Sequence, residues 1–301
     1  MITAFTSGGQ LGNQLMFEAN LLASALDTGI PHTNLSFAAG RDFVCLPPAG
    51  CRVTYAPRRC FFLRKYMGGM HRLFRRAPGI TEVLEDPESA LAVYRQSRRV
   101  LFHGWPYLDL PALTRQQEEV RRRLYPRDDV RRAAEEFVRR HRAPDTILIA
   151  VHIRGGDYRT FFDGRYAFPT EVYRRRMVEL AALYTPAPVK FLIFSDGTVE
   201  EKDFASLPSP VAVSHGSAAA DMTAMSLCDA IVGAPSTFSG FASFMGNVPK
   251  YILLSDTPLT DRRAAGVYMT GVMDDLTDAN GAKVLSYLQN GERVTGGVLR
   301  A

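Results

Sequence analysis

The stretch TILIAVHIRGGDY, residues 146–158, decides the fold predicted for this chain. Its first eight residues form an apolar run typical of a buried β-strand, and the two glycines that follow indicate a loop. The strand thus delivers His152, Arg154 and Asp157 to its carboxyl end. A guanidinium is always charged and presents a planar fork of donors that matches phosphate oxygens, so this loop is suited to binding a phosphate group.

Around this stretch, apolar β-rich runs alternate with helical stretches from residue 145 onward. We expect strands over 146–153, 189–194, 211–214, 230–233 and 251–254, and helices over 170–184, 219–227 and 237–245. Such alternation indicates a parallel sheet covered by helices, a Rossmann-type arrangement of the α/β class. Pro144 is the predicted boundary between an N-terminal domain, 1–144, and a C-terminal domain, 145–301.

Three motifs follow strands of this predicted sheet. They are His152 to Asp157, Phe194 to Gly197, and Pro235 to Ser239. Parallel sheets bind ligands beyond the carboxyl ends of their strands, so we expect the three motifs to form one site. Their shared position is stronger evidence than any of them alone.

The chemistry of each motif allows a functional and a plain structural interpretation. Ser236, Thr237 and Ser239 begin a predicted helix, where free N–H groups favour an anion, although Ser236 could simply cap the helix. Asp196 could accept hydrogen bonds from guanine or ribose, or could only form a turn before Gly197. Asp157 could brace Arg154.

In the N-terminal part we expect a strand over 1–7, a turn over 8–14 and a helix over 15–26. The turn carries Gln10, Gly12, Asn13 and Gln14, and its amides are suited to sugar hydroxyls. Its glycines form only a GxxG pair, which is no dinucleotide fingerprint. Residues 31–111 look irregular apart from a strand at 100–103, and helices are expected over 113–124 and 128–142.

The net charge of +5 is unevenly distributed, because residues 52–142 contain 21 Lys or Arg against 11 Asp or Glu. Within that region, residues 52–76 carry eight basic residues, no acid, and interleaved aromatic and apolar side chains. This pattern is typical of peripheral contact with an anionic membrane, and equally of a solvated helix with one buried face. No nucleic-acid-binding motif accompanies it, so no nucleic-acid partner is expected.

The first residues lack the pattern of a secretory signal, and no run of about 18 uncharged apolar residues occurs. We therefore expect a cytoplasmic protein, either free or peripheral on the inner face of the membrane. Its four cysteines form no CxxC pair, which predicts reduced thiols. No DxD-type carboxylate pair stands out, so no metal is expected.

Taken together, these motifs resemble those of bacterial α-1,2-fucosyltransferases of glycosyltransferase family 11. Residues 9–17, GQLGNQLMF, resemble the family's GRLGNQMFQ with one inserted residue, and 152–158 resemble its HxRRxDY. Residues 194–196 resemble its FSDD, 221–239 resemble the segment that ends in NSTFSWW, and 103–107 weakly resemble GYWQSEKYF. The matches span nearly the whole chain in the family's order.

The resemblance implies a GT-B-like glycosyltransferase with two domains, GDP-fucose as donor, inversion at the anomeric carbon and no metal. It implies that fucose is transferred to an oligosaccharide or glycolipid, with an α-1,2 linkage to galactose as the expected product. Arg154 would be the catalytic residue that holds the β-phosphate of the leaving GDP. The other donor-binding residues would be His152, Asp157, Asp196, Ser236, Thr237, Phe238 and Ser239, and the sugar and acceptor cleft would contain Gln10, Gly12, Asn13 and Gln14.

The chain also departs from the family's pattern. Gly155 replaces the second arginine of HxRRxDY, Gly197 the second aspartate of FSDD, and Pro235 the asparagine before STFS. These differences leave two alternatives open: an enzyme of the same fold that uses another GDP-sugar, and a catalytically degenerate protein that binds glycan or nucleotide. Asp157, Glu18 and Asp221 are candidates for a general base, and none is assigned.

Overall fold

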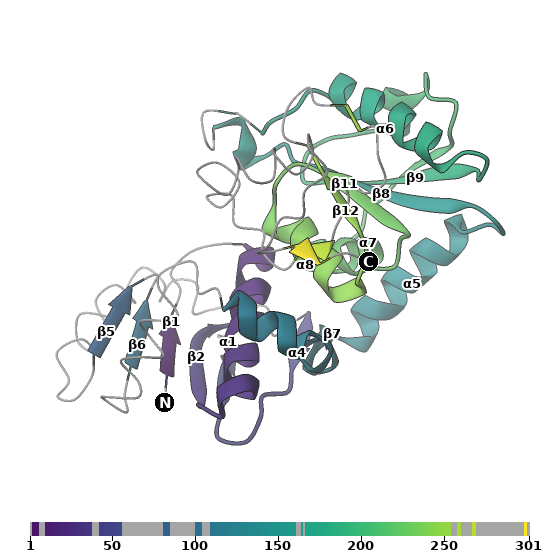
Figure 1. Cartoon of the computed structure of the whole chain (residues 1–301). Coiled ribbons are helices and arrows are strands. Elements are labelled where there is room, and N and C mark those ends of the chain that lie inside the picture. Colours follow the sequence, from purple (N-terminus) through teal and green to yellow (C-terminus); the bar gives the residue numbers. More distant parts are fainter. Residues whose placement is uncertain are drawn as a thin grey trace. The chain divides into compact units, whose positions relative to one another are not determined.

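The computed structural model divides into two compact units, residues 1–127 and 128–301, each built around a parallel five-stranded sheet (Figure 1). The structure describes residues 2–5, 10–37, 42–55, 81–84, 100–103, 109–160, 164, 166–253, 258–259, 267–268 and 298–299. No helix within these residues is both long and apolar enough to cross a membrane.

The sheet of the first unit has the strand order β4-β2-β1-β6-β5, and every neighbouring pair is parallel. Its strands are β1 (Ile2–Phe5), β2 (His32–Phe37), β4 (Arg52–Tyr55), β5 (Thr81–Leu84) and β6 (Val100–His103). β6 is the strand predicted at 100–103, and β1 lies within the predicted first strand. The prediction of an otherwise irregular region was wrong, because β2, β4 and β5 also belong to this sheet.

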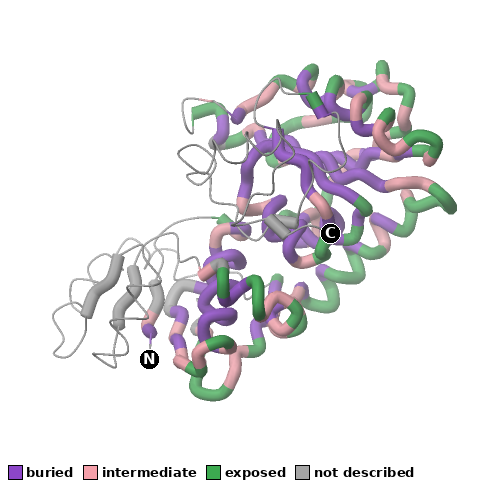
Figure 2. The backbone as a smooth tube through the Cα atoms, in the orientation of Figure 1, coloured by how far each residue is buried: buried purple, intermediate pink, exposed green. Residues whose placement is uncertain are grey.

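Helix α1 (Leu11–Thr28) follows β1, and thirteen of its residues are buried: Gly12 and the twelve consecutive residues 14–25 (Figure 2). Gly29 ends it in the left-handed conformation, with φ 69°, and its N–H bonds the carbonyl of Ala25. The helix begins within the predicted turn, so placing residues 11–14 in that turn was wrong. Burial of nearly the whole helix outweighs the cost of Gly12 near its start, about 1 kcal/mol relative to alanine.

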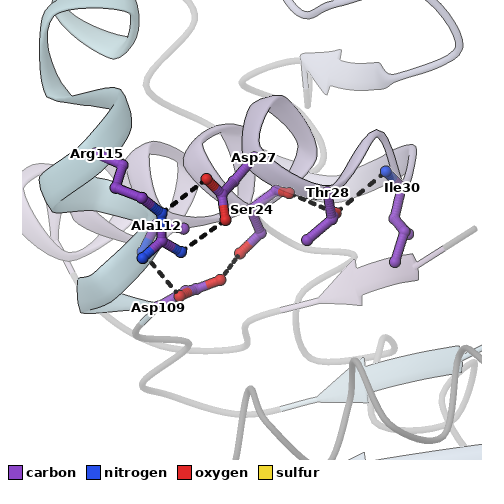
Figure 3. A network of polar contacts seen from close by, with 7 residues as sticks. All are labelled: Ser24, Asp27, Thr28, Ile30, Asp109, Ala112 and Arg115. Carbon is purple, nitrogen blue, oxygen red and sulfur yellow. Dashed lines mark hydrogen bonds and ion pairs between the residues drawn. The ribbon is translucent and has the colours of Figure 1, made fainter.

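Polar contacts join α1 to α4 (Leu110–Arg123), as Figure 3 shows. Ser24 donates to Asp109, which also caps α4 by accepting from the N–H of Ala112. Arg115 binds both oxygens of Asp27, at 2.9 and 2.7 Å. These contacts fix the orientation of α1 on α4. A short antiparallel pair, β3 (Phe43–Cys45) with β7 (Leu124–Pro126), follows the end of α4.

The sheet of the second unit has the order β10-β9-β8-β11-β12, again with every pair parallel. Its strands are β8 (Ile147–Ile153), β9 (Val189–Ser195), β10 (Val211–Val213), β11 (Ala230–Gly233) and β12 (Lys250–Ile252). The predicted parallel sheet is therefore confirmed, strand by strand. Its three inner strands, β9, β8 and β11, are buried on both faces, which is why their sequences are continuous apolar runs.

The two faces of this sheet pack against different helices (Figure 1). Ile149 and Val151 point into a core with Tyr173 and Met177 of α6 (Thr170–Tyr184). The opposite face carries Phe194, whose ring meets Phe137 of α5 edge to face with centroids 5.9 Å apart. The helices on that side are α5 (Asp128–His141), α7 (Ala218–Met225) and α8 (Thr237–Gly246).

The structure divides the chain between residues 127 and 128, just before α5. The predicted boundary was Pro144, which follows this helix. The buried residues of α5 are Val130, Ala134 and Val138, spaced four apart along one face of the helix. That stripe, together with the contact of Phe137 with β9, places α5 in the second unit. A composition break at Pro144 could not reveal which sheet the helix would cover.

Candidate active site

The three sequence motifs meet at the carboxyl edge of the second sheet. β8 lies between β9 and β11, with Ile153 paired to Ser195 and His152 paired to Gly233. The loops that follow these three strands therefore emerge side by side. The prediction that the motifs share one end of the sheet is confirmed.

Arg154 is the central cation of this edge. Its side chain is only 9% exposed, and its Nη1 lies 2.6 Å from Oδ2 of Asp196. Its guanidinium carbon lies 4.6 Å from the ring centre of Tyr158, a cation–π distance. The Tyr158 hydroxyl donates to the carbonyl of Pro235 at 2.5 Å. The guanidinium is thus held between the β9 loop and an aromatic ring that is itself fixed to the β11 loop.

Asp196 braces the loop after β8. Its Oδ1 accepts a hydrogen bond from the N–H of Gly155 at 2.7 Å, while its Oδ2 pairs with Arg154. Its carboxylate is 31% exposed, so it also faces solvent. The sequence allowed Asp157 two roles, as a brace for Arg154 and as a donor-binding residue. Asp157 begins the 3-10 helix η3 (Asp157–Arg159), and its side chain lies outside the described residues. Contact of Asp196 with a nucleoside stays a prediction.

The N-terminus of helix α8 lies at this edge of the sheet, so the backbone N–H groups of its first turn are part of the candidate site. The Oγ of Ser236 accepts from the N–H of Phe238 at 3.2 Å, so Ser236 is the N-cap, as the simpler interpretation predicted. Thr237 is the first residue of the helix. Ser239 is fully buried, and its Oγ has no hydrogen-bond partner among the described residues. The anion-binding role of this turn stays a prediction.

His152 is buried, 2% exposed, and its ring stacks on that of Phe238 with centroids 5.2 Å apart. Burial first, and then the charges of Arg154 and Lys250, lower the pKa of His152 well below its usual range. The ring is therefore neutral near pH 7. Its Nδ1 has no hydrogen-bond partner within the part of the chain that the structure describes. Buried polar atoms of this kind call for a partner, and a bound ligand can supply one.

Lys250 is a basic residue of this site that the sequence analysis missed. It is 1% exposed at the start of β12, and its Nζ donates to the carbonyl of Ala234 at 3.3 Å, just before the N-cap of α8. Burial lowers the pKa of Lys250 to about 7, so a small change of pH near neutrality alters the charge of its side chain. The one available signal was a lysine inside an otherwise apolar β-run, residues 248–254.

The predicted cleft residues of the first unit lie at the start of α1. Gln10 is exposed and occupies the N-cap position without a side-chain cap bond. Gly12 and Gln14 are buried, and Asn13 is partly exposed. The first turn of any α-helix carries backbone N–H groups without intrahelical acceptors, which is compatible with a polar ligand at this end. Their contact with a sugar stays a prediction.

Two of the candidates for a general base, Glu18 and Asp221, have defined partners in the structure. Glu18 could equally have been an exposed residue on its helix, but it is fully buried and paired with His32. Asp221 lies in the first turn of α7 and accepts from the Ser214 hydroxyl at 2.5 Å. Burial raises the pKa of Asp221, and the Ser214 hydrogen bond opposes that change. Ser217, and not Asp221, caps α7.

The described residues contain no group of three or more His, Cys, Asp or Glu side chains arranged to hold a metal ion. Three protein groups give this edge positive charge: the Arg154 guanidinium, Lys250, whose pKa is about 7, and the start of α8. All three adjoin the carboxyl ends of β8 and β11. This edge is therefore a candidate binding site for an anion.

The fold and the candidate site define a class of protein: two units, each with a parallel five-stranded sheet, and a cluster of basic groups at the carboxyl edge of the second sheet. No protein-family model matches the chain, and no curated protein sequence matches it. Solved structures do match. A variant of FUT1 from Arabidopsis thaliana in complex with GDP has a TM-score of 0.53 at 14% identity, covering 90% of this chain and 74% of that protein.

The α-1,6-fucosyltransferase NodZ is similar in two further structures. The crystal form soaked with GDP-fucose has a TM-score of 0.54 at 16% identity, covering 84% of this chain and 95% of NodZ. The NodZ crystal grown with GDP has a TM-score of 0.53. The enzyme comes from Bradyrhizobium. These likenesses show that the chain has the GT-B-like fold of these fucosyltransferases, as the sequence predicted.

Proposed function

We propose that this chain is an inverting glycosyltransferase that transfers fucose from GDP-fucose to a hydroxyl of a glycan acceptor. One observation carries the proposal: a nearly buried arginine, Arg154, is fixed at the carboxyl edge of the second sheet beside the start of α8. The solved proteins of this fold support the choice of donor, since NodZ was soaked with GDP-fucose and FUT1 contains GDP.

In this proposal the protein acts mainly on the leaving group. As the bond between fucose and the diphosphate breaks, negative charge develops on the β-phosphate oxygens, and a preorganised cation there lowers the barrier. Arg154 is preorganised because Asp196 and Tyr158 already fix its guanidinium. The N–H groups at the start of α8 add a positive dipole end. The acceptor hydroxyl then attacks the anomeric carbon from the opposite face.

The nucleoside portion would lie against His152 and the start of α8. Neutral His152 offers a buried Nδ1, and Ser239 offers a buried hydroxyl, and neither atom has a partner among the described residues. Asp196 would contact the nucleoside through its exposed side while it holds Arg154. Phe238, which stacks on His152, shapes the apolar wall beside them.

For the acceptor we propose an oligosaccharide or glycolipid, with galactose as the α-1,2-linked sugar and residues 10–14 in its cleft. Residues 52–76 would place the protein on the inner face of the membrane, in the cytoplasm. Of that segment, 52–55 form β4 and 56–76 lie outside the described residues. Sedimentation with anionic liposomes at low and high salt tests this contact, and no sedimentation at low salt would exclude it.

A ligand panel tests the proposed donor. Thermal unfolding is measured with GDP, GDP-fucose, GDP-mannose and UDP-galactose, and release of GDP is then measured with and without galactose-containing acceptors. We expect GDP and GDP-fucose to raise the unfolding temperature and UDP-galactose to leave it unchanged. Stabilisation by GDP with turnover only of GDP-mannose would establish the alternative GDP-sugar enzyme. Binding without turnover of any donor would establish the degenerate binding protein.

A further inference from the structure

A second polar cluster is buried in the first unit, at the amino-terminal end of its sheet. Glu18 in the middle of α1 is fully buried and lies 3.1 Å from Nε2 of His32, the first residue of β2. The other carboxylate oxygen accepts from Asn34 at 2.7 Å. Ligands bind parallel sheets at the opposite, carboxyl end, so the sugar-nucleotide chemistry proposed above gives this cluster no role.

Cys51 adjoins this cluster. Its sulfur accepts a hydrogen bond from the backbone N–H of His32 at 3.4 Å. Cys51 ends a tight turn in which its own N–H bonds the carbonyl of Pro48, and Gly50 in that turn has φ 84°. Gly50 is exposed and Cys51 is partly exposed, whereas His32 behind it is 1% exposed. The thiol therefore lies between solvent and a buried imidazole.

The second ring nitrogen of His32, Nδ1, is buried and has no hydrogen-bond partner among the described residues. Nε2 is engaged by Glu18, so Nδ1 is the nitrogen left for a neighbouring group. The Glu18 carboxylate thus holds the imidazole, and the Cys51 sulfur lies against the backbone N–H of the same histidine. A carboxylate, an imidazole and a thiol in one cluster favour a thiolate.

The charges around the sulfur favour its ionised form. Burial opposes protonation of His32, but the Glu18 carboxylate and the contact with Cys51 raise the pKa of His32 to about 9. Burial likewise opposes ionisation of Cys51, but hydrogen bonding to His32 and the charge of His32 lower the pKa of this thiol, and Glu18 partly counteracts them. Other titratable or charged groups near this cluster in the described part of the chain include the Cys45 thiol on β3, Arg123 at the end of α4 and the exposed Arg52 beside Cys51.

We propose that Cys51 is a modification site, a thiolate held by the His32–Glu18 pair that undergoes exchange with low-molecular-weight disulfides. The Cys51 sulfur attacks one sulfur of the disulfide, a new S–S bond forms as the old one breaks, and the departing thiolate takes a proton from solvent. The product is the protein with a small thiol attached to Cys51. This inference is independent of the proposed transferase activity.

Two other cysteines provide internal controls. Cys45 is buried and its thiol donates to Glu18, and burial together with that carboxylate raises its pKa. Cys228 is buried and donates to the carbonyl of Ala224, and burial raises its pKa too. Both have the character of inert structural thiols, and they belong to the same folded chain as Cys51.

The test uses the full chain and oxidised glutathione at pH 6. The protein is quenched at timed intervals, digested, and analysed by mass spectrometry so that each cysteine is followed separately. At pH 6 an ordinary thiol is roughly 0.3% ionised, so each unit by which the pKa falls raises the thiolate fraction about tenfold, while the lower nucleophilicity of that thiolate offsets about threefold of the gain. We therefore expect Cys51 to react at least about threefold faster in the folded protein than in the urea-unfolded protein, and Cys45 and Cys228 to react more slowly when folded than when unfolded.

The pH dependence of the Cys51 rate gives the second readout and needs no variant. We expect its midpoint below that of the unfolded chain, and His32→Gln, if folded by circular dichroism, should return the midpoint to the unfolded value. A folded-state rate at Cys51 no faster than the unfolded one, or an unshifted midpoint, overturns the proposal. Modification spread equally over Cys45 and Cys51 would also overturn it, since the His32 contact would then confer no selectivity.

Discussion

Replacement of Arg154 by alanine is the sharpest test of the proposed site. The guanidinium is 9% exposed and is fixed by Asp196 at 2.6 Å and by the ring of Tyr158, so its charge is poorly screened by water. Loss of one preorganised donor to a developing oxyanion typically lowers kcat by about 10²–10³, or roughly 3–4 kcal/mol. We expect kcat to fall by at least that factor in Arg154→Ala. Arg154→Lys should restore only part of the lost kcat, because lysine keeps the positive charge but lacks the planar fork of N–H donors.

The assay measures GDP release and product formation at saturating donor and acceptor. Arg139→Ala is the matched control, because Arg139 is a 75% exposed arginine on α5 that pairs only with its helix neighbour Glu136 in the described contacts. The far-ultraviolet circular dichroism and the unfolding midpoint of each variant exclude simple unfolding. Turnover by a folded Arg154→Ala protein within about threefold of the unaltered chain would refute the argument that this cation stabilises the leaving group.

Asp196→Asn separates positioning from direct binding in the same experiment. The amide keeps the shape of the side chain but removes the charge that holds Arg154, so we expect a loss on the order of tenfold and strong coupling to Arg154 in a double-mutant cycle. If Asp196 instead contacts only the nucleoside, its substitution should raise the KM for the donor and be additive with that of Arg154. Additive effects would therefore contradict the bracing role of Asp196.

Three further predictions follow from the same sheet. Gly233→Ala would place a Cβ 2.7 Å from the carbonyl oxygen of His152, so it should destabilise the protein by about 1–3 kcal/mol in urea unfolding, while Gly197→Ala, with no contact closer than 3.7 Å, should change stability little. Because the pKa of Lys250 falls from its unfolded value to about 7, the folded state binds fewer protons than the unfolded state between pH 7 and about 10, and unfolding free energy should rise with pH there. Lys250→Met should remove this rise of the unfolding free energy with pH, and an unchanged slope in the variant would refute the assignment of the rise to Lys250. Activity should persist in EDTA, since Arg154 and the start of α8 supply positive charge; loss of turnover restored by Mn²⁺ would contradict this expectation.

The Lys250 prediction also bears on donor binding. Protonation below pH 7 adds a buried positive charge beside the carbonyl of Ala234, next to the helix that would receive the diphosphate. GDP-fucose keeps its diphosphate charge across this range, so its affinity should increase from pH 8 to pH 6 in the unaltered protein. The increase should be absent in Lys250→Met. Isothermal titration calorimetry at the two pH values measures both affinities.

The sequence alone determined much of the second unit. Strands β8, β9 and β11 are buried on both faces, so each is a continuous apolar run that local patterning reveals. Once the strands alternate with helices the sheet must be parallel, and the residues after each strand must share one edge. That is why the sequence is sufficient to place His152, Arg154, Asp196 and Ser236 at one edge of the sheet.

The first unit was harder to predict because its strands are short and carry polar residues. β2 reads HTNLSF, and the burial of His32 and Asn34 depends on Glu18, which lies on another element. The start of α1 was misplaced for a similar reason, since the three glycines and three amides among residues 8–14 suggest a turn. Only packing shows that Gly12 and Gln14 are buried in a helix.

Tertiary structure also decided which groups act on one another. The pairing of Arg154 with Asp196 joins residues 42 positions apart, and that of Cys51 with His32 joins residues 19 apart. The burial of Lys250 depends on where β12 lies beside β11. Residue type and spacing specify that these groups exist and which strand each follows. Sheet register and helix packing determine their distances and dielectric surroundings, and these determine their charge, their pKa and therefore their chemistry.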